Sequence, residues 1–280
     1  MPLKYFQTVR AKWENGTLGM NPIVKTIRHI VATIGNELSR VYNDLTIAVF
    51  GHRQFKRFIV LARARTGSNM LMSILDSHPN IRAGKREIFC RLEGRHYKDL
   101  LAKSFRKSPR HIKARGFKIF YYHPSDGPCD DLWNDLVKME DLYIIHLKRR
   151  NILRSVVSQE IAKKSGHWER QSGQETDLKD KAVTLTTEDL DAHFHRTREF
   201  EERGDEMFKD HPMITVYYED LADNPDGAFD EIMDFLGLPH GQPQTNLVKQ
   251  NPESLKDLIT NYDELESAFQ ETRWQSFFRQ

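Results

Sequence analysis

The stretch Phe58-Ile-Val-Leu-Ala-Arg-Ala-Arg-Thr-Gly-Ser-Asn-Met-Leu71 joins an apolar run to a polar turn and then to an apolar helix. The run 58–61 predicts a short buried strand, and the pattern from Met70 to Leu75 predicts a helix after one tight turn. Such a turn points several backbone N–H groups and the positive end of the helix dipole at one spot. We therefore predict an anion-binding site at this turn.

The residue types in the turn fit this interpretation. Gly67 lets the backbone approach a ligand closely, and the Arg65 guanidinium is a planar fork suited to anionic oxygen atoms. The predicted binding residues are Arg65, Thr66, Gly67, Ser68, Asn69 and Met70. The alternative is that Ser68 and Asn69 only cap the helix and that Arg65 is solvated.

The turn differs from the phosphate-binding loop of nucleoside triphosphatases. That motif, GxxxxGK[ST], needs a Lys followed by a hydroxyl group that binds magnesium. Here Gly67 is followed by Ser-Asn-Met, without such a Lys. The turn therefore predicts an anion that is bound without a metal.

A second basic turn follows the predicted strand 142–147. The segment Lys148-Arg-Arg-Asn-Ile-Leu-Arg-Ser-Val-Val-Ser158 leads from that strand into a helix. Arg149 and Ser158 are candidates for a second anion site, although Arg150 also lies in the turn and either arginine could face the ligand. A solvated basic face is the alternative.

The sequence as a whole predicts an α/β domain with a helical extension. The predicted strands are 58–61, 116–121, 142–147 and 213–218, and the predicted helices that separate them include 130–138, 151–163, 187–208 and 226–236. Strands that alternate with helices connect by right-handed crossovers, which predicts a central parallel sheet flanked by helices. We assign this domain to residues 56–280.

Residues 1–55 form a separate N-terminal extension in this interpretation. Apolar residues spaced by three and four predict an amphipathic helix over 22–48. Its apolar face either packs on the main domain or contacts a partner, such as a second subunit or a membrane surface.

Composition excludes several classes of function. The 280 residues carry a formal charge of only +2, which does not indicate nucleic-acid binding. The two cysteines, Cys90 and Cys129, form no disulfide or zinc-site pattern and fit a reducing compartment. No apolar run is long enough for a signal peptide or a membrane span, so we expect a cytoplasmic protein.

Both basic turns, in this order, resemble the two phosphate-binding elements of PAPS-dependent sulfotransferases (PAPS is 3′-phosphoadenosine-5′-phosphosulfate). The resemblance is to the bacterial carbohydrate branch, such as the trehalose and nodulation-factor enzymes, and it covers about residues 56–278. It implies a P-loop-like three-layer fold and a donor, PAPS, that leaves as adenosine 3′,5′-bisphosphate. By this resemblance Arg65 and the loop amides hold the 5′-phosphosulfate, and Arg149 and Ser158 hold the 3′-phosphate.

The resemblance also implies further site residues. Glu87, in Lys85-Arg-Glu-Ile-Phe89, matches a Glu that serves as general base, with Lys85 and Arg86 as nearby positive charges. His123, after the strand 116–121, is the alternative base. Lys249 and Gln250 match a loop that covers the nucleotide. Lys118, inside the strand 116–121, is interpreted as packing its aliphatic stem.

The acceptor is the least defined substrate. Resemblance to the carbohydrate branch implies a hydroxyl group of a carbohydrate or glycolipid, and the polar segment 164–186, with Trp168, is a candidate specificity element. Two other functions stay open at this point. A P-loop kinase or hydrolase would need magnesium, and a non-catalytic nucleotide-binding domain would give no turnover.

Overall fold

The computed structural model describes residues 29, 31–33, 37, 42, 45–84, 86–166, 181–247 and 251–279. The chain divides into two compact units, Met1–Gly51 and His52–Gln280. In the first unit the described residues from 29 to 50 are helical, within and just beyond the predicted helix 22–48. Its exposed apolar side chains include Tyr42, Val49 and Phe50. No helix in the described part of the chain is long and apolar enough to cross a membrane.

The second unit is built on a five-stranded sheet in which every pair of neighbours is parallel, in the order β2-β3-β1-β4-β5. The strands are β1 Lys56–Ala62, β2 Ile81–Gly84, β3 Ala114–Phe120, β4 Leu142–Lys148 and β5 Met213–Tyr217. The chain builds β2 and β3 on one side of β1 and then crosses to build β4 and β5 on the other. The loops that follow β1 and β4 therefore diverge at the centre of the sheet, where ligands bind in open α/β folds.

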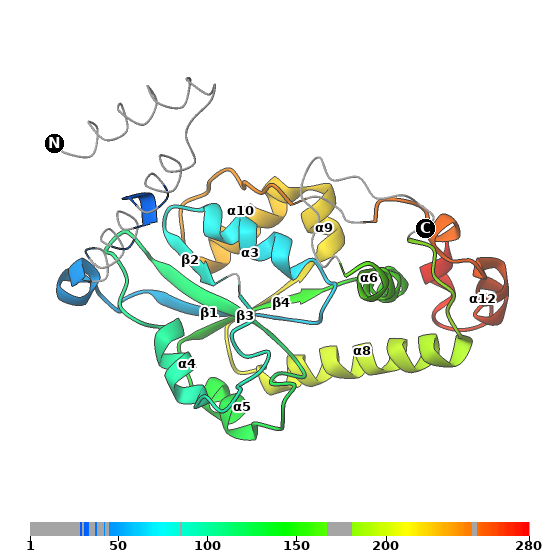
Figure 1. The fold of residues 1–280 in the computed structure, drawn as a ribbon, viewed down its shortest axis with the longest axis horizontal. Helices are drawn as coiled ribbons and strands as arrows, with labels where there is room; N and C mark the ends of the chain where they lie inside the picture. Colours follow the sequence, from blue (N-terminus) through cyan, green and yellow to red (C-terminus); the bar gives the residue numbers. More distant parts are fainter. Residues whose placement is uncertain are drawn as a thin grey trace, which may run out of the picture. The chain divides into compact units, whose positions relative to one another are not determined.

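Helices cover both faces of the sheet (Figure 1). One face carries α3 Ser68–Ser77, α9 Tyr218–Asp223 and α10 Pro225–Leu236, and the other carries α4 Tyr97–Ser104, α5 Asp130–Val137 and α8 Thr187–Met207. Alternate side chains of β1 point to opposite faces of the sheet. Phe58, Val60 and Ala62 pack with α3 and α10. Ile59 and Leu61 pack with α4 and α5. Burial on both faces explains why β1 is apolar from Phe58 to Ala62.

A third apolar cluster holds the C-terminal segment against α6 Ile152–Ser165. This segment contains α11 Leu255–Leu258, α12 Tyr262–Ala268 and the 3₁₀ helix η1 Gln275–Phe278. The Asn151 side-chain amide at the start of α6 donates to the Phe277 carbonyl at 2.9 Å. The cluster thus ties the chain around residue 251 to the helix that follows β4.

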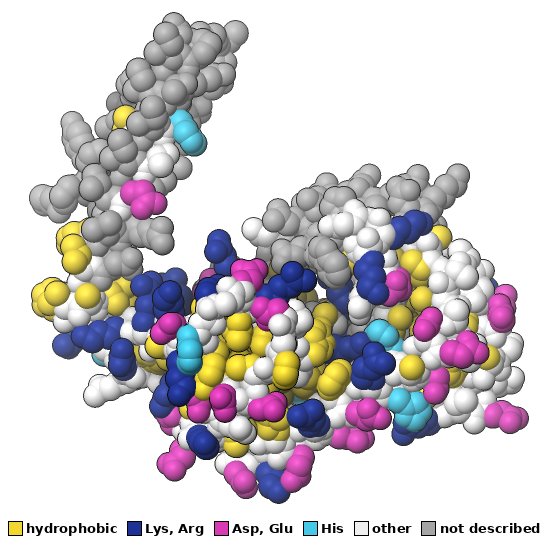
Figure 2. Space-filling view, turned by 60° about the horizontal axis from the view of Figure 1, so that its bottom comes forward, with side chains coloured by type: hydrophobic (Ala, Val, Ile, Leu, Met, Phe, Trp, Pro, Cys, Tyr) yellow, Lys and Arg dark blue, Asp and Glu magenta, His cyan; other side chains and the backbone are white. Residues whose placement is uncertain are grey.

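The predicted α/β fold with a parallel sheet is confirmed, and the predicted strands and helices agree with the observed ones within a few residues. The strand β2 and the helix α4 were not predicted. Tyr218 was predicted to end the last strand but begins α9 instead. Charged side chains of both signs are interspersed over the described surface of the second unit that is visible in Figure 2.

Gly116 of β3 provides a test of the packing. It lies beside Phe58 of β1, and a Cβ atom there would meet the Phe58 carbonyl oxygen at 2.2 Å and its ring at 2.5 Å. We expect Gly116→Ala to lower the free energy of unfolding by about 1–3 kcal/mol, measured by urea denaturation. Gly84→Ala, at an edge strand where the nearest atom would lie at 3.5 Å, is the matched control. Equal effects of the two substitutions would contradict the packing described here.

Candidate active site

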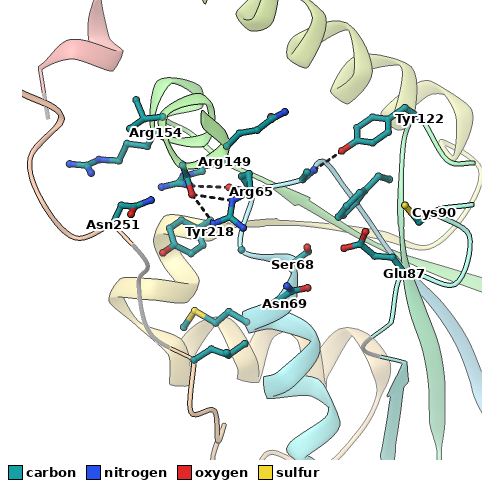
Figure 3. Close-up of a pocket in the computed structure, with 18 of the residues that line it drawn as sticks. Arg65, Ser68, Asn69, Glu87, Cys90, Tyr122, Arg149, Arg154, Tyr218 and Asn251 are labelled. Atoms are coloured by element: carbon teal, nitrogen blue, oxygen red, sulfur yellow. Dashed lines mark hydrogen bonds between the residues drawn. The ribbon is translucent and has the colours of Figure 1, made fainter. Parts of the chain in front are cut away.

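A cavity of about 460 Å³ opens beyond the carboxyl ends of β1, β3 and β4. Its walls come from the turn after β1, the start of α3, α6, and residues 87, 90, 120, 122, 123, 125, 247, 251, 255 and 258. Figure 3 shows Arg149, Arg154 and Asn251 at one end, Glu87, Cys90 and Tyr122 at the other, and Arg65 between them. Of the predicted residues, the cavity wall includes Arg65, Gly67, Ser68, Asn69, Met70, Glu87, His123, Arg149 and Ser158.

The turn after β1 has the backbone conformation of a tight anion-binding loop. Arg65 and Gly67 both have positive φ angles, 67° and 84°, and Gly67 caps α3 without a side-chain hydrogen bond. The first turn of α3 contains no acidic residue that would compete with an anion for the helix dipole. The Thr66 hydroxyl, predicted as a ligand donor, instead donates to the Arg63 carbonyl at 2.7 Å and braces the turn.

Position 67 requires a glycine for two reasons, its positive φ angle and the close approach of a neighbouring side chain. A Cβ atom there would lie 2.2 Å from Cδ2 of Tyr218, the first residue of α9. The Arg149 guanidinium lies over the same Tyr218 ring, 4.5 Å from its centroid. The Tyr218 ring therefore packs between the first predicted anion turn and the second.

The second turn brings Arg149, and not Arg150, to the cavity. Arg149 is 8% exposed, and burial lowers the pKa of its guanidinium to about 10, so it stays charged at neutral pH. Its Nη1 donates to the Arg65 carbonyl at 2.9 Å. Arg150 instead pairs with Asp220 at 2.6 Å and lies over the Tyr217 ring at the surface.

Arg65 joins the two turns directly. Its Nε and Nη2 atoms donate to the Ser158 hydroxyl of α6 at 3.0 and 2.8 Å. Its carbonyl accepts from Arg149 and, at 3.3 Å, from the Ser155 hydroxyl. The two predicted anion sites therefore share one wall of the cavity.

Glu87 is paired with a buried lysine. The Nζ atom of Lys118 lies 3.0 Å from Oε1 of Glu87 and donates to the Asn69 side-chain oxygen at the start of α3. Lys118 is 2% exposed and shares its face of β3 with Gly116 and Phe120. It was expected only to pack its stem, and Lys85 and Arg86 were the positive charges expected near Glu87. Arg86 is exposed, and Lys85 lies outside the described residues.

His123 also lines the cavity, but its ring is buried and hydrogen-bonded within the protein. It is 3% exposed, and burial lowers its pKa to about 4, so the ring is neutral at pH 7. The Phe120 amide donates to its Nδ1 atom at 3.2 Å. Glu87, Cys90 and His123 bring potential metal-ligand atoms within 4.8 Å of one another, but Glu87 and His123 already have these protein partners.

Several cavity residues were not predicted. Arg154, Tyr218 and Asn251 line one end, and Cys90 and Tyr122 line the other. The charged Lys118 within the apolar run from Gly116 to Tyr121 was a sequence signal for an unusual buried contact. Lys249 and Gln250 lie outside the described residues, although Leu247 and Asn251 on either side of them line the cavity.

Comparison with known proteins finds a similarity to sulfotransferases. The model of the Sulfotransferase family matches residues 138–242, from the end of α5 to just past α10. The chain is 26% identical to nodulation protein H of Rhizobium tropici over 238 residues, which is 79% of this chain and 92% of that protein. Nodulation protein H of Rhizobium meliloti strain 1021 is 25% identical over 79% of this chain and 94% of that protein. The chain is therefore similar to sulfotransferases over residues 138–242, and it is distantly similar to nodulation protein H over 79% of its length.

Two solved sulfotransferase structures are also similar to this chain. A sulfotransferase from Alicyclobacillus acidocaldarius is 14% identical, with a TM-score of 0.49, and the match covers 80% of this chain and 95% of that one. A mouse sulfotransferase complexed with PAP is 12% identical, with a TM-score of 0.41, over 84% of this chain and 91% of that one.

The buried His123 ring makes stability depend on pH. Its pKa is about 4 in the folded state against an ordinary value of 6.5, so the unfolded chain takes up a proton first as the pH falls below 6.5. We expect the free energy of unfolding to fall between pH 7 and pH 5, with up to about 2 kcal/mol of the loss due to this ring.

His123→Asn keeps an acceptor near the Nδ1 position but does not titrate in this range. Urea denaturation at the two pH values should therefore show a smaller loss of stability for this variant than for the natural chain. The same loss in both proteins would mean that His123 is not buried as a neutral ring.

Proposed function

We propose that this protein is a sulfotransferase that transfers the sulfuryl group of PAPS to a hydroxyl group of a carbohydrate or glycolipid, without a metal ion. The observation that carries the proposal is the pair of anion-binding turns joined through Arg65, with the Glu87–Lys118 pair across the same cavity. Adenosine 3′,5′-bisphosphate carries two anionic groups, and two joined cationic turns suit such a molecule.

The residues of the cavity fit the donor substrate. In this proposal the amides of the first turn of α3, with Arg65, bind the 5′-phosphosulfate. Arg149 and Ser158 bind the 3′-phosphate. The buried Nε atom of Arg149 has no hydrogen-bond partner among the described residues, with Oε1 of Glu219 at the longer ion-pair distance of 3.9 Å, and an anionic oxygen atom of the ligand would supply one.

The reaction is a single in-line displacement. The acceptor oxygen attacks sulfur, and the new S–O bond forms as the bond between sulfur and the 5′-phosphate oxygen breaks. The electron pair of that bond leaves with adenosine 3′,5′-bisphosphate, where Arg65 and the helix dipole stabilise the developing charge. The acceptor proton passes to the Glu87 carboxylate.

Lys118 orients the base in this mechanism. Its ammonium group holds one Glu87 oxygen, which leaves the other carboxylate oxygen to accept the proton. The same ammonium group contacts Asn69, so it links the base to the phosphate-binding end of α3. Similarity to nodulation protein H and the resemblance of the Glu87 segment to the carbohydrate branch support a carbohydrate or glycolipid acceptor.

Glu87→Gln tests the assignment of the base. The amide can still accept from Lys118 but cannot take up a proton, so we expect kcat at saturating PAPS to fall by about 10²- to 10⁴-fold. Binding of adenosine 3′,5′-bisphosphate should stay within about twofold of the natural protein, since the nucleotide-binding groups are unchanged. Glu93→Gln, an exposed change in the same segment, is the control and should have full activity.

The measurement is release of adenosine 3′,5′-bisphosphate with a panel of hydroxylated acceptors, with and without EDTA. Turnover that persists in EDTA supports the metal-free mechanism and excludes a magnesium-dependent kinase. Full turnover of Glu87→Gln would show that Glu87 is not the base, and absence of turnover in the natural protein with every acceptor would favour a binding role.

A further inference from the structure

Unsatisfied buried polar atoms gather at one end of the cavity. Within the described residues these atoms are Nε of Arg149, Nδ2 and Oδ1 of Asn251, and Oε2 of Glu253. Arg149 and Asn251 line the cavity, and the Glu253 carbonyl accepts from the cavity residue Arg154 at 3.1 Å. More than nine in ten buried polar groups have partners in folded proteins. A cluster of unsatisfied atoms therefore indicates where a ligand completes the structure.

Asn251 is the most informative of these residues. It is 8% exposed, it points into the cavity at the end opposite Glu87 (Figure 3), and neither polar atom of its amide has a partner in the described structure. Burying an amide without hydrogen bonds costs about 1–3 kcal/mol, so a residue of this type is expected to be matched by a ligand.

The backbone around Asn251 is held in place. Arg154 of α6 binds the Glu253 carbonyl, and the buried Lys181 pairs with the Glu253 carboxylate at 2.6 Å. The Ser254 hydroxyl caps α11 by accepting from the Asp257 amide. The Asn251 amide is thus presented to the cavity by a chain that is anchored on its C-terminal side.

The chemistry of the amide selects the ligand group. Its N–H₂ donor and its carbonyl acceptor lie side by side. A phosphate group offers only acceptors, so it would satisfy Nδ2 and leave Oδ1 unsatisfied. The edge of adenine offers an amino donor beside a ring-nitrogen acceptor, and an Asn amide can bind both at once.

The neighbouring walls suit a base. Leu255 and Leu258 of α11 line this part of the cavity with apolar surface. Arg149, with its unsatisfied Nε atom, supplies the cation that a phosphate requires, so Asn251 is not needed for that purpose.

We propose that Asn251 reads the adenine base of the donor nucleotide through its 6-amino group and an adjacent ring nitrogen. The proposal rests on the proposed function, because it assumes that the donor is an adenosine nucleotide. It makes Asn251 the residue that distinguishes a 6-aminopurine from a purine without the amino group.

The test compares two ligands by titration calorimetry with the full chain. Adenosine 3′,5′-bisphosphate has the 6-amino group, and purine riboside 3′,5′-bisphosphate lacks it but has the same phosphates. The natural protein should bind the adenosine compound roughly tenfold more tightly. In Asn251→Ala the preference should fall to about one, because the acceptor of the amino group is gone.

Asn251→Leu, of similar size, provides a second variant if the alanine variant does not fold, and Asn134→Ala on the exposed face of α5 is the control that should keep the natural preference. Variants that bind both ligands more weakly but keep the tenfold preference would overturn the proposal for Asn251, as would a natural protein that binds both ligands equally. A natural protein that binds neither ligand would overturn the proposed function itself.

Discussion

The hydrogen bonds of Arg65 join the two halves of the site. Arg65 has a φ angle of 67°, a conformation that costs a non-glycine residue about 1 kcal/mol or more. In return its carbonyl accepts from Arg149 and Ser155, and its guanidinium donates twice to Ser158. The turn after β1 and the helix after β4 therefore cannot move independently. Because both turns present positive charge to one cavity, this coupling sets the spacing between two bound anionic groups.

The two ends of the cavity differ in whether their buried polar groups have partners in the protein. At one end Lys118 is withdrawn from water and must be paired, and it is paired with Glu87 and Asn69. This places a carboxylate beside the start of α3. At the other end Asn251 and Arg149 are buried with polar atoms that no described residue satisfies. The charged groups at the Glu87 end have protein partners, whereas buried polar atoms at the Asn251 end have none among the described residues. This difference is expected if the reacting group lies near Glu87 and the nucleotide lies near Asn251.

The sequence was sufficient for every strand of the sheet except β2, and for the two basic turns, because apolar runs and a strand–turn–helix pattern are local signals. It could not choose between Arg149 and Arg150, since neighbouring residues of a turn have no periodicity; the choice follows from the pairing of Arg150 with Asp220, seventy positions along the chain. The role of Lys118 depends on the register that sets it opposite Val60 and toward α3. Asn251 became a candidate only once its neighbours were known to leave its amide unsatisfied.

The central claim is that two joined turns bind two anionic groups of one nucleotide without a metal. Calorimetry in EDTA with adenosine 3′,5′-bisphosphate, adenosine 5′-phosphate and adenosine 3′-phosphate tests it most directly. We predict that the bisphosphate binds at least about tenfold more tightly than either monophosphate, a difference of roughly 1.4 kcal/mol or more. Equal affinity for the bisphosphate and adenosine 5′-phosphate would contradict the claim, because it would mean that the turn containing Arg149 binds no phosphate.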